Sequence, residues 1–228
     1  MRLGKSKTPA PRYRKQEGGS STVHFANKTP LGNLSGIISD FQNAHPDIEL
    51  VRTTPSEQSE NIGYDIEFFA SSKEQDAKNT HYICDEHYVL LVSEKHPLAK
   101  KDFVELKNLS REKFIVSSST SEMNGIVRGM FKEAGFFPDP VIALPVFWDI
   151  MAMTEQGFGC CIATDITWIC NTNLKLKALR ILDTPRSRSL YLGFPSGAYI
   201  SKATKVFANY LIDQIGSLRR KHDERFLY

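Results

Sequence analysis

One pattern occurs twice along this chain: a short apolar strand, then a polar segment, then a helix with apolar residues on one face. The first copy covers residues 22–44, and its polar segment includes Thr29 and Pro30, a typical N-cap and first helical residue. The second copy covers residues 114–134 and ends at Gly135, which suits a left-handed helix terminus. Strands that alternate with helices predict open α/β sheets, and two copies predict two lobes that face a cleft.

The rest of the sequence continues this alternation. A buried strand is expected at residues 88–92, where the longest unbroken apolar run lies, and a last amphipathic helix is expected after Ser201. The other predicted elements are strands at residues 47–51, 64–69, 141–144, 160–163, 179–182 and 190–194 and a helix at 147–156.

Composition is that of an ordinary globular protein. The 228 residues are 41% hydrophobic and 24% charged, which is too apolar for disorder and too mixed for a coiled coil. The longest apolar run, about five residues, is far shorter than the roughly 20 that a bilayer requires, and no signal peptide is recognisable. Four cysteines, two of them adjacent, do not resemble a disulfide framework. We therefore expect a cytoplasmic protein without membrane association.

Positive charge is concentrated at the N-terminus. Residues 1–20 hold six basic side chains and one acid, giving +5, so the remaining residues carry −2 of the total charge of +3. We interpret this stretch, which is poor in apolar residues, as a disordered basic tail, a linker or a cloning remnant. The slightly acidic body has no inherent attraction for phosphate backbones, so the folded part is not expected to bind nucleic acid.

Two patterns that imitate binding motifs are better explained as structure. His81, Cys84 and His87 have metal-like spacing, but side chains three apart on a strand point to opposite faces. Residues 157–162 contain two glycines of a dinucleotide-binding fingerprint, yet they lie between a helix and a following strand, the reverse of the required order. We expect no metal site here, and a tight helix-to-strand turn at residues 157–162.

The sequence contains no motif that is typical of a catalytic site. Cys160, Cys161 and Cys170 are candidates for a redox sensor, but adjacent cysteines in an apolar strand are more often small core residues. No nucleophile elbow, phosphate-binding loop or zinc-protease motif is present, and paired acids such as Asp65 and Glu67 lie on strands with a solvated face. We therefore expect no catalytic residue, metal ion or cofactor.

The two polar segments at strand ends are the strongest candidates for a binding site. Helix N-termini carry unpaired N–H groups and a partial positive charge, so two of them that face one crevice can bind a small anion. Open α/β sheets also bind ligands at the carboxyl ends of their strands. Alternatively, these hydroxyls only cap their own helices, and the residues alone favour neither interpretation.

Five short segments, in a fixed order, match a known family. They are FQNAHPDIEL at residues 41–50, LVSEKHPLA at 91–99, LKNL at 106–109, FKEAGFFP at 131–138 and EQGFGCCI at 155–162. The set resembles the effector-binding domain of LysR-type transcriptional regulators over about residues 21–215. The resemblance implies an α/β, two-lobed, type 2 periplasmic-binding-protein-like fold, in which each lobe is an open mixed sheet flanked by helices.

The family fold implies that two crossover strands join the lobes. Residues 21–92 and 194–228 would form lobe I, residues 93–193 would form lobe II, and the crossovers would fall near residues 89–93 and 191–194. Family members dimerise, with the helix that begins at Leu31 of one subunit near the helix around Arg128 of the other. We therefore expect a homodimer, or a tetramer of the full-length protein.

The resemblance also implies where a small-molecule effector binds. The family's contacts lie in the first strand–helix loop, at the first helix N-terminus of lobe II, and at the start of the next helix. In this sequence those positions are Asn27, Lys28, Thr29, Ser117, Ser118, Ser119, Thr120, Phe147 and Trp148. A tryptophan beside two capped helices predicts an effector with an anionic end and an apolar or aromatic body.

The family's winged helix-turn-helix does not occur in these residues, so DNA contacts are expected only through a domain outside them. Residues 163–165 also lack the proline that often follows this strand in the family. A solute-binding protein of a transport system shares the fold and is the alternative function; the missing signal peptide and the cysteine usage disfavour it. An enzyme on the same scaffold is disfavoured because no nucleophile–base or metal constellation is found.

Overall fold

The structure, a computed structural model, describes residues 21–29, 34–53, 64–119, 121–167, 173–197 and 199–226. In chain order its elements are β1 (Ser21–Asn27), α1 (Leu34–Ala44), β2 (Ile48–Thr53), β3 (Ile66–Ser71), β4 (Thr80–Ser93), the 3₁₀-helix η1 (Pro97–Lys100), β5 (Phe103–Val104), the 3₁₀-helix η2 (Leu106–Leu109), β6 (Phe114–Ser117), α2 (Glu122–Glu133), β7 (Pro140–Leu144), α3 (Phe147–Glu155), β8 (Cys161–Thr164), β9 (Leu176–Ile181), β10 (Ser187–Gly193) and α4 (Lys202–Phe226). The predicted tail and the predicted first helical residue, Pro30, lie outside the described residues.

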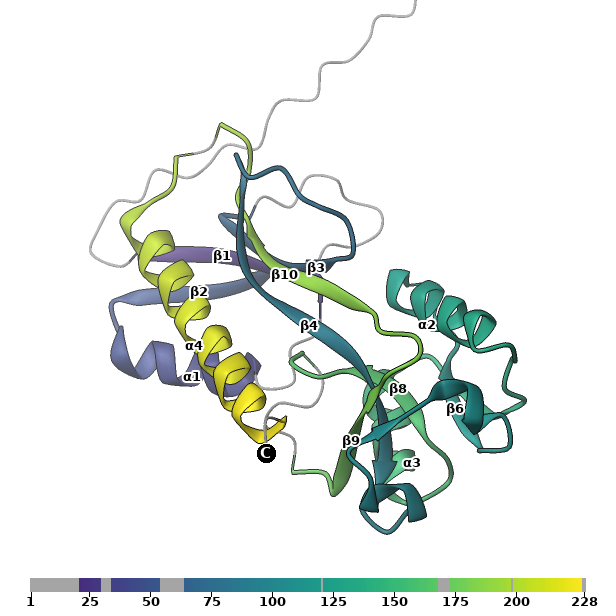
Figure 1. Cartoon of the computed structure of the whole chain (residues 1–228). Helices are drawn as coiled ribbons and strands as arrows, with labels where there is room; N and C mark the ends of the chain where they lie inside the picture. Colours follow the sequence, from purple (N-terminus) through teal and green to yellow (C-terminus); the bar gives the residue numbers. More distant parts are fainter. Residues whose placement is uncertain are drawn as a thin grey trace, which may run out of the picture.

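One large mixed sheet runs through the molecule (Figure 1). Its strand order is β2-β1-β3-β10-β4-β9-β5, and β8 also pairs with β4. Strand β1 is parallel to β2 and β3, whereas β10 is antiparallel to β3 and β4. Strands β6 and β7 form a separate parallel pair. The predicted mixed α/β architecture is thus confirmed.

Strand β4 belongs to both halves of the molecule (Figure 1). Its residues 80–87 pair with β10, and its residues 88–93 pair with β8 and β9. The chain returns to the first half between Ile181, the end of β9, and Ser187, the start of β10. Both changes of partner come before the crossovers expected at residues 89–93 and 191–194. An apolar run reveals where both faces of a strand are covered, and it carries no signal for a change of pairing partner.

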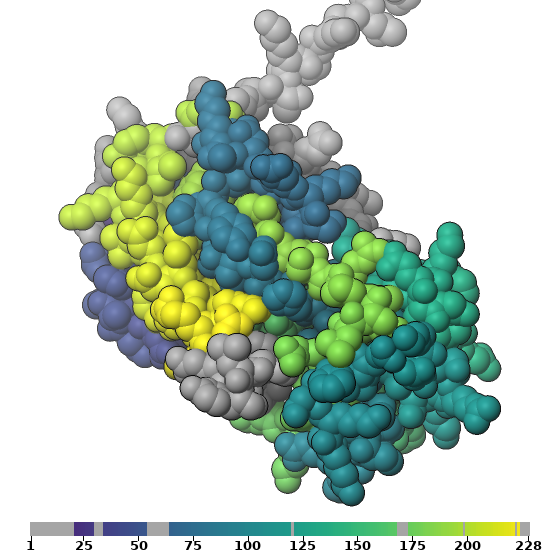
Figure 2. All heavy atoms as spheres, viewed as in Figure 1, coloured from purple at the N-terminus to yellow at the C-terminus, as the bar shows by residue number. Residues whose placement is uncertain are grey.

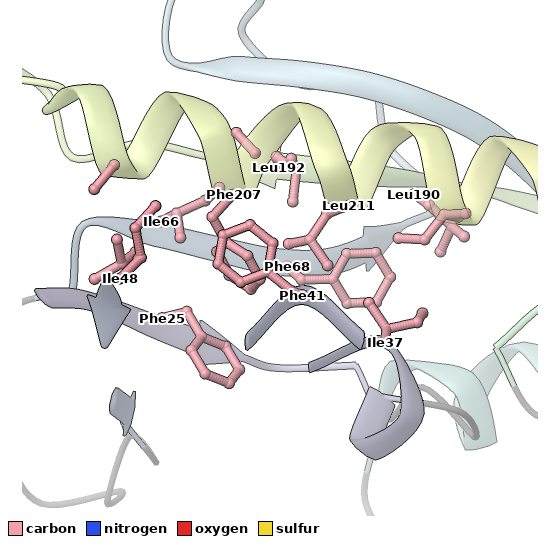
Figure 3. Packing of buried hydrophobic residues seen from close by; sticks show 14 of the residues in the cluster. Phe25, Ile37, Phe41, Ile48, Ile66, Phe68, Leu190, Leu192, Phe207 and Leu211 are labelled. Atoms are coloured by element: carbon pink, nitrogen blue, oxygen red, sulfur yellow. The ribbon is translucent and has the colours of Figure 1, made fainter. Parts of the chain in front are cut away.

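The first core lies between the sheet and helices α1 and α4, which are side by side (Figure 1). Phe41 of α1 and Phe207 of α4 are both fully buried, and their ring centroids are 4.9 Å apart (Figure 3). Leu190 and Leu192 of β10 pack into the same cluster. The two helices, far apart in sequence, therefore cover this part of the sheet together.

The second core has two layers on opposite faces of β4. Leu90 packs with Phe131 of α2, whereas Leu91 packs with Ile150 of α3, because successive side chains of a strand alternate in direction. In Figure 2 the teal residues of this half lie at one end of the molecule, and the purple and yellow residues of α1 and α4 lie at the other. The molecule therefore has two separate cores, and strand β4 runs through both of them.

Glycines confirm the predicted helix ends and the turn before β8. Gly135 and Gly157 have φ values of +84° and +82°, in the left-handed region. Gly159 passes so close to Lys113 that an added Cβ would lie 2.7 Å from the Lys113 carbonyl oxygen. The segment before β8 is therefore a tight turn between a helix and a strand, as its position in the sequence predicts.

The spacing of His81, Cys84 and His87 does not form a site. Cys84 is buried in β4 while both histidines are exposed, as the alternation of strand side chains predicts. Within the described ranges, no group of three or more His, Cys, Asp or Glu side chains is arranged to hold a metal ion. No helix in those ranges combines the length and apolarity needed to cross a membrane.

Candidate functional site

A cavity of about 860 Å³ lies between the two cores. The first half contributes residues from the ends of β1, β3 and β10, and the second half contributes residues from β6, α2 and α3. Its size falls within the range of about 300–1,000 Å³ that is typical of small-molecule sites.

Six of the nine predicted site residues line this cavity: Lys28, Thr29, Ser117, Ser119, Phe147 and Trp148. Asn27 does not line it, and its buried Oδ1 has no hydrogen-bond partner among the described residues. Ser118 turns to the neighbouring strand, where its N–H donates to the carbonyl of Leu144 at 2.9 Å. Thr120 lies outside the described residues. The fold thus brings three distant segments of the sequence to one cavity.

The end of β1 contributes a threonine that the neighbouring strand holds in place. The Thr29 hydroxyl accepts a hydrogen bond from the Ala70 N–H at 2.9 Å, and Thr29 is buried. Lys28 pairs with Glu67 of β3, with 2.5 Å between Nζ and Oε1. Parallel pairing of β1 with β3 places these side chains together. Capping of α1 by Thr29 stays a prediction, because the residues that join Thr29 to α1 lie outside the described ranges.

The serines between β6 and α2 serve two different purposes. The Ser121 hydroxyl accepts a hydrogen bond from the Asn124 N–H at 3.3 Å and caps α2. The Ser117 and Ser119 hydroxyls lie 2.8 Å apart, and the Asn124 side chain donates to the backbone carbonyls of both serines. The first turn of α2 therefore holds Ser117 and Ser119 at the cavity wall while a third serine caps the helix.

Aromatic side chains line the cavity from both halves. Phe147 and Trp148 begin α3, and Trp148 is 42% exposed. Phe69 of β3 and Phe194 after β10 line the cavity from the first half. The sequence analysis did not find these two phenylalanines, because alternation marks them only as ordinary strand residues. The cavity wall thus has aromatic rings from both halves, a lining that suits an apolar ligand body.

The sequence analysis also missed Arg188, a buried cation of β10 that lines the cavity. Its Nε donates to Glu86 Oε1 at 2.6 Å, and its Nη2 donates to Thr167 Oγ1 at 3.3 Å. Glu86, fully buried on β4, also accepts a hydrogen bond from the Thr167 N–H at 2.9 Å. Arg188 is the direct register partner of Glu86. No local pattern in the sequence reveals this pairing.

The charged groups of the cavity wall have both signs. Two cations, Lys28 and Arg188, and two carboxylates, Glu67 and Glu122, line it. Each cation is paired with a carboxylate, Lys28 with Glu67 and Arg188 with Glu86. The wall therefore carries oriented hydrogen-bond donors and no excess of positive charge.

A second polar cluster lies on β4 where its pairing changes. The His87 N–H donates to Asp165 Oδ1 at 2.8 Å, and Arg219 Nη1 of α4 donates to Asp165 Oδ2 at 2.9 Å. The hydrogen bond between the His87 ring and Asp165 raises the pKa of His87, although burial acts in the opposite direction. The cluster ties α4 of the first half to the turn that follows β8.

The cysteines favour the interpretation as core residues over redox sensing. Cys84, Cys160 and Cys161 are free and buried. Burial raises the pKa of Cys84 and of Cys161 to about 12, and it raises the pKa of Cys160 as well. Thiols with such pKa values stay protonated at neutral pH, and the thiolate is the reactive form. Cys170 lies outside the described residues.

Comparison with known proteins gives a family and a set of structural neighbours. The family model "LysR substrate binding domain" matches residues 14–216. The effector-binding domain of QuiR in complex with shikimate is 20% identical, with 86% of this chain and 97% of that chain covered and a TM-score of 0.61. HinK, a LysR family transcriptional regulator from Pseudomonas aeruginosa, is 22% identical, with 87% and 71% covered and a TM-score of 0.67. The effector-binding domain of BenM with its effector benzoate is 18% identical, with 89% and 95% covered and a TM-score of 0.64.

A comparison with curated proteins gave no match. The family and these structural neighbours are ligand-binding domains of transcription regulators, not enzymes. The neighbours share the periplasmic-binding-protein-like fold, and the family match spans most of the sequence, including every residue of the cavity wall. This chain therefore belongs to the LysR substrate binding domain family.

Proposed function

We propose that this domain binds a small-molecule effector in the cavity between its cores and signals its presence within a LysR-type transcription regulator. The observation that carries the proposal is that Thr29, Ser119 and Phe147, from three distant segments, line one cavity. Relatives with the same fold hold small molecules: shikimate in the QuiR domain and benzoate in the BenM domain.

The proposed effector is anionic. Shikimate and benzoate both carry a carboxylate, which is ionised at neutral pH. In this chain the N-terminus of α2 provides a partial positive charge next to the hydroxyls of Ser117 and Ser119. Phe147 and Trp148 suit an apolar or aromatic ligand body beside that charge.

The proposed signal is a change in lobe closure or in dimer packing. We propose that the two halves are the two lobes, with their boundaries at the changes of pairing partner near residues 87–88 and 181–187 instead of near residues 92 and 194, in a cytoplasmic homodimer with α1 of one subunit near α2 of its partner. An effector that contacts both lobes stabilises the arrangement in which it binds more tightly. The DNA-binding domains of the regulator would then be re-spaced by that arrangement.

Titration with small carboxylates by isothermal calorimetry tests the binding site. Thr29→Ala and Ser119→Ala each remove one hydroxyl from the cavity wall, and we expect each to weaken binding about 3–10-fold, the effect of one hydrogen bond. Ser110→Ala, at an exposed position after η2, is the matched control. Unchanged affinity in both cavity variants would exclude this placement of the effector.

Light scattering tests the proposed assembly separately. We expect the mass of two chains of 25.8 kDa each at micromolar concentration. A monomer at every concentration would contradict the homodimer and leave the effector site unaffected.

A further inference from the structure

The turn that follows β8, residues 164–167, connects the second core to the first. Ala163, in β8, packs in the second core, whereas the fully buried Ile166 packs in the first core. The Thr167 N–H donates to Glu86 at 2.9 Å, on the part of β4 that pairs with β10. The turn therefore joins the two halves, in addition to β4 and the passage from β9 to β10.

Asp165, in this turn, presents one carboxylate oxygen to two side chains from different elements. Arg219 Nη1 of α4 donates to Asp165 Oδ2 at 2.9 Å, and His87 Nδ1 of β4 lies 3.5 Å from the same oxygen. The two nitrogens are 3.3 Å apart, and Asp165 is buried. Arg219 thus holds the oxygen, and His87 lies within reach of it.

The contact between the two nitrogens depends on the protonation state of His87. A guanidinium has no acceptor, so the Arg219 N–H groups meet His87 Nδ1 favourably only when Nδ1 carries a lone pair. This geometry fits a neutral His87 with its proton on Nε2. A proton added to Nδ1 would face the guanidinium, and Asp165 Oδ2 is the acceptor beside it. Protonated His87 and Arg219 therefore compete for one oxygen.

Arg219 has a second carboxylate available on its own helix. Its Nη2 lies 2.6 Å from Asp223 Oδ1, and its Nε donates to Asp223 Oδ2 at 3.2 Å. Asp223 is four residues further along α4, the spacing at which helix side chains meet. An Arg219 that leaves Asp165 therefore remains paired, and the exchange leaves no cation without a carboxylate.

The charges around His87 act on it in both directions. The hydrogen bond to Asp165 raises the pKa of His87, burial and the charge of Arg219 act to lower it, and Asp85 of the same strand acts to raise it. Glu86, the residue between Asp85 and His87, points to the opposite face of β4. The register partner of His87 on β10 is uncharged. Among the described residues, Arg219 is thus the cation that opposes protonation of His87.

We propose that Asp165 is the shared acceptor of a pH-dependent switch that holds or releases the C-terminal end of α4. Neutral His87 leaves Asp165 to Arg219, and the end of α4 is held against the turn that joins the two halves (Figure 1). Protonated His87 takes the oxygen, Arg219 transfers to Asp223, and the end of α4 is released. The switch operates without an effector, so it does not rest on the proposed function.

Acid is expected to affect the whole domain and the end of α4 in opposite directions. Because the folded state raises the pKa of His87, protonation stabilises the folded domain, and this stabilisation is lost as the pH rises through the folded pKa. The same protonation removes the contact between Arg219 and Asp165, so the end of α4 opens more often. General unfolding in acid would weaken both together.

Amide hydrogen exchange of the complete chain tests the switch. Protection factors, corrected for the intrinsic exchange rate, are compared for residues 216–223 at about pH 6 and about pH 9, on either side of the ordinary histidine pKa. In the wild type we expect them to be about 2–5-fold lower at the acid pH, the effect of one partly exposed ion pair. His87→Gln removes the titrating group and is expected to abolish this difference.

Two neighbouring arginines of α4 provide a matched pair of variants. Arg219→Gln is expected to lower the protection of residues 216–223 equally at both pH values, because the contact with Asp165 is gone. Arg220→Gln is the control, since Arg220 is exposed and donates to Ser217 of its own helix. It is expected to keep the pH difference of the wild type.

Titration of the histidine ring signals by NMR measures the competition directly. In Arg219→Gln the pKa of His87 is expected to be higher than in the wild type, because the competing cation is absent. In Arg220→Gln it is expected to equal the wild-type value.

Three results would overturn the switch: equal protection of residues 216–223 at both pH values in the wild type, a pH difference that persists in His87→Gln, or an unchanged His87 pKa in Arg219→Gln. If Arg219→Gln does not fold, the comparison of the wild type with His87→Gln decides. None of these results bears on the calorimetric test of the effector site, so the two proposals fail independently.

Discussion

Ser72 and Glu122 form a direct contact between the two halves of the molecule: the Ser72 hydroxyl donates to Glu122 Oε1 at 2.6 Å. Ser72 follows β3 of the first half, whereas Glu122 begins α2 and lines the cavity. At the other end of α2, Glu133 pairs with Arg186, just before β10. Both ends of α2 are therefore tied to segments that lead into the first half.

Ser72→Ala is expected to loosen α2 without unfolding the domain. The contact is exposed, so we expect a loss of at most about 1 kcal/mol in the free energy of unfolding. Amide hydrogen exchange in the first turn of α2 should become faster. Ser110→Ala is the control, and exchange in α2 that equals the wild type would contradict the role of this contact.

Arg188→Ala is expected to be strongly destabilising, because it leaves the fully buried Glu86 without its cation. We expect Arg188→Ala to lose about 3–5 kcal/mol in the free energy of unfolding. When Glu86→Ala is added, the double variant is expected to lose less than the sum of the losses in the two single variants. Urea denaturation of the four proteins measures this coupling. Lys177→Ala, which breaks the exposed pair with Asp102, should cost less than about 1 kcal/mol. Strictly additive losses at Glu86 and Arg188 would refute the coupling.

His87 predicts a pH dependence of stability. Its pKa in the folded protein is raised, chiefly by the hydrogen bond to Asp165, above the value of about 6.5 of an unfolded chain. The folded state therefore binds the proton more tightly, and this contribution is fully present below about pH 6.5 and is lost as the pH rises through the folded pKa. The melting temperature of the wild type should fall between pH 6 and pH 8 as His87 loses its proton. In His87→Gln this fall should be smaller, because the variant lacks the titrating group. Identical pH profiles for the two proteins would show that the pair with Asp165 does not form.

Two glycines provide a matched pair for a test of packing. An added Cβ at Gly159 would meet the Lys113 carbonyl oxygen at 2.7 Å, whereas an added Cβ at Gly125 of α2 has nothing within 4 Å. Gly159→Ala is expected to destabilise by about 1–3 kcal/mol through overpacking. Gly125→Ala is expected to stabilise by about 0.5–1 kcal/mol through helix propensity. Thermal melts of both variants check the opposite signs, and a neutral Gly159→Ala would disprove the close approach.

Much of the candidate site could be predicted because its signals are local or match the family pattern. Ser121 caps α2 through a contact with Asn124, only three residues away, so the hydroxyl-rich segment marks a helix start in the sequence. Lys28, Thr29 and Ser119 follow strand ends, and Ser117 is the last residue of β6; ligands of open α/β sheets bind at such ends. Asn27 and Ser118 were predicted in the same way, but they are absent from the cavity wall, because neighbouring residues of an extended segment point in different directions.

The amino-acid sequence by itself determined the order of strands and helices, the glycines that end helices at Gly135 and Gly157, and the family, because these depend on short-range spacing and backbone preference. Only the tertiary structure decided that Glu86 meets Arg188, 102 residues later, and that β4 is shared by two cores. A pairing between distant strands depends on register and on burial from both sides, and neither leaves a local pattern. Arg188, which lines the cavity, and its partner Glu86 were therefore found only once the chain was folded.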